Sequence, residues 1–421
     1  MALPEIAALL QPYLTAVQDD PQILLVVVLA LGLGWLWLSR MQQARKSSIL
    51  TSLPADDFPP IEPLPEFDWA STEPEQLRPF RAREGRYNLT MALEPLPPSA
   101  LLPLDNTYAT RLSQRAALLR SHPDTVVGIH GDEADSRTAS AVCEYYTFLL
   151  GTYLPARYPD VFRLHATKLL NENKIHMLEN RARGGELWPV TVGDSMGAKG
   201  MRVAARKALE NLVRVVDEDV FFLFPEEEEE PASSGTEPDA DNDPGDGERK
   251  YFLKAYASPF PSGFNPAQKL GLPLSGIHAP VPGYADKLER GMDRFFGRLE
   301  PGTYKQRTNW TVTTGTGLFA AFGGVHGGDD DGEQELRADE LDLESTVLRC
   351  ERQTVHRLPK SKAVVFAFHT YTYPISQIKD EGLGEELARA IDGLKEGNVP
   401  RMHVYKRAPV WGEAVKEYLR S

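Results

Sequence analysis

One uncharged apolar run near the N-terminus constrains this chain more than any other feature. Residues Ile23 to Leu38 read ILLVVVLALGLGWLWL. With Gln22 and Ser39 the run has 18 residues. A helix of that length spans about 27 Å, close to the thickness of an endoplasmic-reticulum bilayer. The run therefore predicts one transmembrane helix over residues 23–39, preceded by a short extracytosolic tail at residues 1–22.

A cleaved signal peptide and a short buried helix are the alternatives to an anchor. A signal peptide needs a basic start, whereas residues 1–22 contain three carboxylates and no Lys or Arg. The basic residues Arg40, Arg45 and Lys46 follow the run directly. Because basic flanks stay on the cytosolic side, we expect a single-pass protein of the endoplasmic reticulum whose C-terminal domain is cytosolic.

Charge and cysteine content exclude several classes of protein. The chain has 60 acidic and 46 basic residues, and its net charge is −14. An acidic surface repels phosphate backbones, so we expect no nucleic-acid partner. Cys143 and Cys350 are too few for a disulfide framework or a cysteine-rich metal site, and such low usage is typical of a reducing compartment.

The remainder of the chain divides into a tether and a domain. Residues 40–80 are rich in Pro, acidic and aromatic residues and have no period, which is typical of a tether that partly packs on its domain. We expect a folded domain over residues 81–421. Helical spacing of apolar residues predicts helices at residues 139–154, 200–216, 284–299, 383–394 and 410–419.

Aromatic and β-branched runs predict five strands in the second half of the chain. They cover residues 220–224, 251–257, 306–314, 346–357 and 363–373. One predicted helix, residues 284–299, falls between the second and third strands. This order predicts an α+β fold with a PAS-like five-stranded antiparallel sheet, inserted and flanking helices, and a core at about residues 217–375.

An acidic segment separates the first two predicted strands. Residues Glu226 to Glu248 include 11 carboxylates and no Lys or Arg. Such a segment cannot bury a core, so we expect a disordered surface insertion over residues 226–249. A docking site for a basic partner is the functional alternative.

The sequence lacks the common signatures of hydrolases, kinases, dinucleotide enzymes and zinc proteases. Two clusters remain. The first is GIHAPVPGY, Gly276 to Tyr284, where His278 lies in a turn stiffened by Pro280 and Pro282. A rigid turn beside apolar residues suits an imidazole that must point into a pocket as an axial haem ligand. The structural alternative is a hydrogen-bonded histidine without a ligand.

The second cluster is LRCERQTVHRLP, Leu348 to Pro359. On a strand, Glu351 and Gln353 share one face and Arg352 lies on the other, and both faces carry charge. One interpretation is an exposed strand with salt bridges. The other is that Arg352 or Gln353 points into a cleft and binds an anion such as a carboxylate. Asn309 and Tyr371 are polar groups on neighbouring predicted strands.

An ordered set of motifs resembles the haem-dependent oxidative N-demethylase-like family over about residues 80–375. In chain order the motifs are Pro259-Phe-Pro-Ser262, Ile277-His-Ala-Pro-Val-Pro-Gly-Tyr284, Arg307-Thr-Asn-Trp310, Leu348-Arg-Cys-Glu-Arg-Gln-Thr354 and Arg357-Leu-Pro359. The chain departs from the family at Gly263-Phe264, where Arg-Trp is common, and at His369, where Arg is common. Its predicted anchor and acidic insertion resemble a fungal-type, membrane-anchored member.

The resemblance implies a PAS-like domain that binds haem b and uses O₂ to demethylate a small secondary amine, releasing formaldehyde. It implies electrons from NAD(P)H through a separate flavin and iron–sulfur reductase. It also implies that His278 is the iron ligand. The other implied site residues are Arg352, Gln353, Arg307 and Tyr284 for cofactor binding, and Tyr371 and Asn309 for catalysis.

Two other functions stay open on the sequence alone. The domain is also compatible with a haem-binding sensor that has no turnover, although no output domain is evident. A cofactor-free PAS-like interaction module is the third hypothesis. A Soret band separates the third from the first two, and formaldehyde release separates the enzyme from the sensor.

Overall fold

The computed structural model describes residues 48–81, 86–131, 135–168, 174–192, 197–226, 249–315, 317–327 and 334–421. The predicted transmembrane helix at residues 23–39, its tail and nearly all of the acidic insertion lie outside these residues. In the part of the chain that is described, no helix has the length and apolar character needed to cross a membrane.

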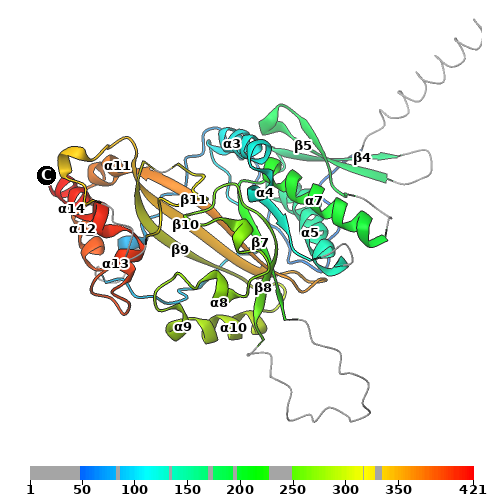
Figure 1. Ribbon diagram of the computed structural model, residues 1–421. Helices are drawn as coiled ribbons and strands as arrows, with labels where there is room; N and C mark the ends of the chain where they lie inside the picture. The colour runs from blue at the N-terminus through cyan, green and yellow to red at the C-terminus, as the bar shows by residue number, and fades with distance from the viewer. Residues whose placement is uncertain are drawn as a thin grey trace, which may run out of the picture.

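A seven-stranded antiparallel sheet with the order β2-β9-β10-β11-β7-β8-β3 forms the centre of the fold (Figure 1). The five predicted strands correspond to its long strands, which are β7 (Asp219–Pro225), β8 (Tyr251–Ala257), β9 (Tyr304–Thr314), β10 (Thr346–Arg357) and β11 (Val364–Pro374). The predicted number of strands is wrong, because β2 (Glu94–Pro95) and β3 (Val127–Ile129) extend the two edges. Strands this short show no period in the sequence.

The pairing of β9, β10 and β11 decides which side chains share a face. Gln353 lies opposite Arg307 of β9 and Phe368 of β11. Arg352, its neighbour in sequence, lies opposite Thr308 and His369. Because successive side chains of a strand point to opposite sides, Gln353 and Arg352 face different sides of the sheet.

Three long helices cover one face of the sheet, namely α3 (Tyr108–Ser121), α5 (Ser136–Phe148) and α7 (Gly197–Val215) (Figure 1). Tyr145 of α5 packs edge-on against Phe222 of β7, with ring centroids 5.7 Å apart. The helix predicted at residues 139–154 corresponds to α5, a π-helical turn at Leu149–Tyr153 and α6 (Leu154–Arg157). A short helix, α4 (Pro123–Val126), leads into β3.

A second antiparallel sheet has no counterpart among the predicted elements. Its order is β1-β4-β5-β6, formed by Ser48–Leu50, Phe162–Lys168, Lys174–Asn180 and Glu186–Pro189. The predicted tether supplies the edge strand β1, which pairs with β4, and it continues over the π-helical turn, where the Leu53 N–H donates to the Gly151 carbonyl at 2.7 Å. A Cβ at Gly151 would lie 2.8 Å from Val190 Cγ1 and 2.9 Å from Leu53 Cδ1, so a larger residue here would force these side chains to shift.

The opposite face of the large sheet is covered by shorter helices, α8 (Leu274–Ile277), α9 (Tyr284–Lys287) and α10 (Glu289–Arg298). The single helix predicted at residues 284–299 divides at Leu288, whose φ of −120° and ψ of −35° are not helical. The apolar stripe of α10 packs on an aromatic sheet face. That face includes Phe221, Leu253, Val355 and Phe368.

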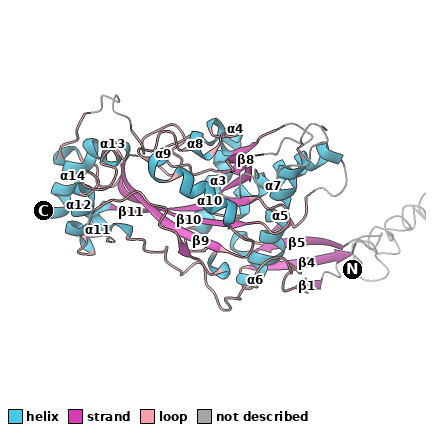
Figure 2. Ribbon diagram, turned by 90° about the horizontal axis from the view of Figure 1, so that it is seen from below, coloured by secondary structure: helices cyan, strands magenta, loops and turns pink. Residues whose placement is uncertain are grey.

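Four helices close the chain at one end of the long strands (Figures 1 and 2). They are α11 (Ile375–Asp380), α12 (Gly384–Asp392), α13 (Met402–Tyr405) and α14 (Ala408–Arg420). The helices predicted at residues 383–394 and 410–419 correspond to α12 and α14. Trp411 of α14 is 1% exposed and lies in a core shared with α12 and the ends of β10 and β11.

Candidate functional site

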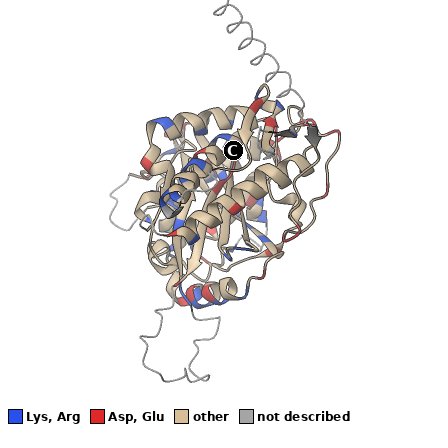
Figure 3. Cartoon of the chain, turned by 90° about the vertical axis from the view of Figure 1, so that its right-hand side faces the viewer, with Lys and Arg blue, Asp and Glu red and all other residues tan. Residues whose placement is uncertain are grey.

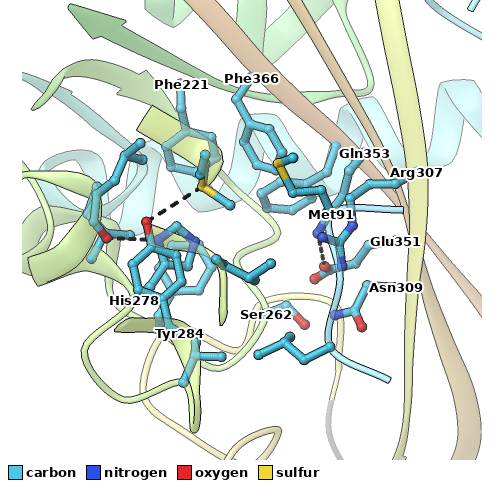
Figure 4. A pocket seen from close by; sticks show the side chains of 18 of the residues that line it. Met91, Phe221, Ser262, His278, Tyr284, Arg307, Asn309, Glu351, Gln353 and Phe366 are labelled. Atoms are coloured by element: carbon cyan, nitrogen blue, oxygen red, sulfur yellow. Dashed lines mark hydrogen bonds between the residues drawn. The ribbon is translucent and has the colours of Figure 1, made fainter. Parts of the chain in front are cut away.

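A cavity of about 320 Å³ lies between the aromatic face of the sheet, helices α8 to α10 and the segment that follows α13. This volume is within the range of small-molecule sites, about 300–1,000 Å³. Figure 4 shows His278 and Tyr284 on one side, with Arg307, Glu351, Gln353 and Asn309 across from them. Phe221 and Phe366 form part of the wall between.

His278 is positioned as a ligand by its own backbone. It follows α8 directly, and its Nδ1 lies 2.8 Å from the carbonyl oxygen of Leu274. Because a carbonyl only accepts, Nδ1 carries the proton and Nε2 keeps its lone pair. Burial lowers the pKa of His278 to about 4, so the ring is neutral at physiological pH. An anchored Nδ1–H is the usual support for a metal-binding imidazole.

Tyr284 holds the His278 ring in place. The two rings stack with centroids 4.5 Å apart and planes 12° from parallel. Tyr284 is buried, and its hydroxyl lies 3.7 Å from the sulfur of Met292 in α10. The sequence motif that ends at Tyr284 therefore supplies both the imidazole and the ring that fixes its plane.

Three more predicted site residues come together on β9 and β10. Arg307, Asn309 and Gln353 all line the cavity. Gln353 donates from Nε2 to Glu351 Oε2 at 2.9 Å, so the two side chains orient each other. Arg307 and Gln353 are direct neighbours across the β9–β10 ladder.

Arg352 and Tyr371, which the sequence also predicts as site residues, do not line this cavity. Arg352 donates to the carbonyls of Ala100 and Leu101 at 2.6 and 3.2 Å on the other side of the sheet. Tyr371 is buried on that same side, with its ring 4.4 Å from His369. The physical reason is the two-residue period of a strand, which separates Arg352 from Gln353. Cofactor contact by Arg352 and catalysis by Tyr371 stay predictions, and Arg352 lines a second pocket together with Arg307 and Asn309.

On the sheet face away from the cavity, the buried carboxyl group of Glu218 gives a testable prediction. Both oxygens of Glu218 are buried without a hydrogen-bond partner in the described part of the chain. Burial raises the pKa of Glu218 to about 8. The folded protein thus holds a proton that the unfolded chain releases above its ordinary pKa, and the stability contribution of this group declines between about pH 5 and pH 8.

We expect Glu218→Gln to remove that decline. The variant's unfolding free energy should exceed that of the unchanged protein by an amount that grows from pH 5 to pH 8, as measured by urea denaturation. The exposed Glu344→Gln provides the control, since its difference from the unchanged protein should stay constant. If the unfolding free energies of Glu218→Gln and the unchanged protein differ by the same amount at every pH from 5 to 8, the pKa of Glu218 is not raised by folding.

Three cavity residues, Glu351, Lys406 and His326, were not predicted. Glu351 was detectable, because strand periodicity places it beside Gln353. Lys406 and His326 come from connecting segments with no local signal. His326 also lines the cavity, where its ring stacks on Tyr405 at 4.3 Å, its Nδ1 is buried without a hydrogen-bond partner among the described residues, and a hydrogen bond with the Ser262 backbone opposes the lowering of its pKa by burial.

The charge of the cavity contrasts with that of the exterior. In Figure 3, Lys and Arg residues and Asp and Glu residues are interspersed along the helices and loops. Among the described residues, the charged side chains that line the cavity are three basic ones, Lys269, Arg307 and Lys406, and one carboxylate, Glu351. A cationic enclosure in a chain of net charge −14 favours an anionic ligand.

These residues fit a haem group. His278 offers an unprotonated Nε2, aromatic and aliphatic side chains suit the faces of a porphyrin, and the cations suit its carboxylates. No other histidine of the cavity has its Nδ1 anchored in this way among the described residues.

Comparison with known proteins agrees with this fit. A search of curated proteins finds no match to the chain. The family model described as haem-dependent oxidative N-demethylase, alpha subunit-like, matches residues 92–416, which is well over half of the chain. The match includes every strand and helix that surrounds the cavity. The chain therefore belongs to the haem-dependent oxidative N-demethylase, alpha subunit-like family.

Proposed function

We propose that this protein binds haem b through His278 and uses O₂ to remove a methyl group from a small secondary amine. The observation that carries the proposal is the His278 imidazole, held by Leu274 through Nδ1 at a cavity with cationic and aromatic walls. The five long strands, with α8 to α10 inserted between the second and third, support a PAS-like core.

Haem supplies the oxidising chemistry when bound. The balanced reaction takes R–NH–CH₃, O₂, two electrons and two protons to R–NH₂, formaldehyde and water. The chain's own residues must bind the amine, orient its methyl group and exclude bulk water. His278 would hold the cofactor, and the polar residues across the cavity would bind the substrate.

Glu351 is the residue suited to the amine. A secondary amine is protonated at physiological pH, and Glu351 carries the one carboxylate among the described residues that line the cavity. Its hydrogen bond from Gln353 fixes the direction of that carboxylate. Glu351 can therefore hold the ammonium and accept its proton before the methyl group reacts. Asn309 lies opposite Glu351 on β9 and serves to orient the substrate.

Electron supply and location belong to the same proposal. The two electrons come from NAD(P)H through a separate flavin and iron–sulfur reductase. The apolar run at residues 23–38 supports attachment to the endoplasmic-reticulum membrane, with the domain on the cytosolic side. Attachment to one membrane raises the effective concentration of the chain near a membrane-bound reductase.

Formaldehyde release tests the proposed function directly. We expect the full chain, loaded with hemin, to release one formaldehyde per two electrons when supplied with a methylated secondary amine, O₂ and a reductant. Omission of hemin, O₂ or the reductant should each abolish release. A Soret band with no formaldehyde from any amine would favour the haem sensor, and a folded protein that stays colourless with hemin would favour the cofactor-free module.

A further inference from the structure

Lys406 is a buried cation that the proposed reaction does not use. Its side chain follows α13, lines the cavity and is 2% exposed. Its Nζ lies 3.2 Å from Asn309 Oδ1 and also donates to the Trp310 carbonyl, and the ammonium lies 5.0 Å from the centroid of the Tyr87 ring. These partners are all neutral. No carboxylate lies within 4 Å of Nζ in the described ranges, and the carboxylate whose charge acts on Lys406 from farther away is Glu351.

An unpaired buried charge is costly, and it becomes favourable only with an opposite charge. Burial lowers the pKa of Lys406 to about 7, which reflects that cost. The oxygens of Asn309 and Trp310 and the ring of Tyr87 offset part of the free-energy cost of burying this ammonium. An anionic group placed in the cavity would complete the site around Nζ.

The cofactor has other cations for its own carboxylates. Burial is the main cause of the lowered pKa of His278, and the positive charges that add to it are Arg307 and Lys269. Lys406 adds instead to the effect of burial on His326. Lys406 is therefore not among the cations whose charge acts on His278, although Arg307 acts on both His278 and Lys406.

Lys406 and Glu351 converge on one place. Asn309, which accepts from Lys406, lies directly opposite Glu351 across the β9–β10 ladder. Side chains in directly opposite positions have Cβ atoms about 5 Å apart. Figure 4 shows Asn309 and Glu351 together, across the cavity from His278. Lys406, which could bind a carboxylate, and Glu351, which could bind an ammonium, therefore lie on either side of the Asn309 amide.

We propose that the substrate is an N-methyl amino acid, with its ammonium at Glu351 and its carboxylate at Lys406. This inference rests on the proposed function and deepens it. An amino acid carries the two groups on one carbon, which matches two opposite charges held on either side of Asn309. A plain alkylamine such as dimethylamine would satisfy Glu351 and leave Lys406 without an anion.

The test compares substrates that differ only in the carboxylate. N-methylglycine and N-methylglycinamide have nearly the same size, and the second is uncharged at that position. For the hemin-loaded full chain, we expect kcat/KM for formaldehyde release to be about 10- to 100-fold higher for N-methylglycine. Titration of the Soret band with each compound should show the same preference without turnover.

Lys406→Met tests the residue. The preference for N-methylglycine should fall to near one, whereas Lys379→Met, which removes a lysine that contacts Tyr418 and Ser421 away from the cavity, should keep it. If Lys406→Met does not fold, the ratio of kcat/KM for N-methylglycine and N-methylglycinamide in the unchanged protein tests the inference instead.

Three results would overturn the inference. Equal kcat/KM for the two compounds would reject the carboxylate site while the released formaldehyde preserved the proposed function. Loss of haem from folded Lys406→Met would assign this lysine to the cofactor instead. Absence of formaldehyde from every amine tested, with haem bound, would reject the proposed function and the inference together.

Discussion

Full-length protein with His278→Ala should fail to develop the Soret band of a histidine-bound haem that the unchanged protein develops with hemin. The reason is that His278 alone among the described cavity histidines has an anchored Nδ1–H and an unprotonated Nε2. Alanine removes the proposed iron ligand and leaves space beside the Tyr284 ring. We expect this change to have the largest effect of any single substitution, because it would remove the imidazole that is proposed to bind the iron.

Absorbance titration with hemin measures the effect, and two further measurements make it specific. Imidazole added to the His278→Ala protein should restore the band, since it fits the space that the side chain left. His326→Ala changes the other histidine of the same cavity and should keep the band. An unchanged spectrum for His278→Ala, or loss of the band in His326→Ala alone, would assign the ligand to His326.

Glu351→Gln should lower kcat/KM for the amine by about 10²–10³-fold, because it removes the carboxylate that balances the substrate ammonium. Glutamine keeps the size of the side chain and can still pair with Gln353. Haem binding should therefore persist, and the circular dichroism spectrum should be unchanged. The loss is expected in formaldehyde release under subsaturating amine.

The matched control is the same chemical change at an exposed position, Glu344→Gln, just before β10. It should leave kcat/KM within about twofold, as surface substitutions usually do. A Glu351→Gln protein with full activity would mean that the amine binds elsewhere. Loss of haem in that protein would instead place Glu351 among the groups that hold the cofactor.

Local patterns determined much of this fold in advance. The bounds of β8 and β10 agree with the predicted strands, and the helix over residues 200–216 corresponds to α7. These elements are long and periodic, so local side-chain pattern is enough to define them. The short edge strands β2 and β3 and the break at Leu288 depend on neighbours distant in the sequence, and no local pattern marks them.

The residues of the candidate site also divide into those that local sequence predicts and those that only the tertiary structure brings together. The sequence by itself determined the turn that carries His278, the strand that carries Gln353 and the family to which the chain belongs. Only the tertiary structure decided which strand face adjoins the cavity, and it placed Arg352 and Tyr371 on the other side of the sheet. It also brought Lys406 to Asn309, about a hundred residues away. Periodicity encodes the direction of each side chain within its own element, whereas the meeting of elements is set by long-range packing that no local window contains.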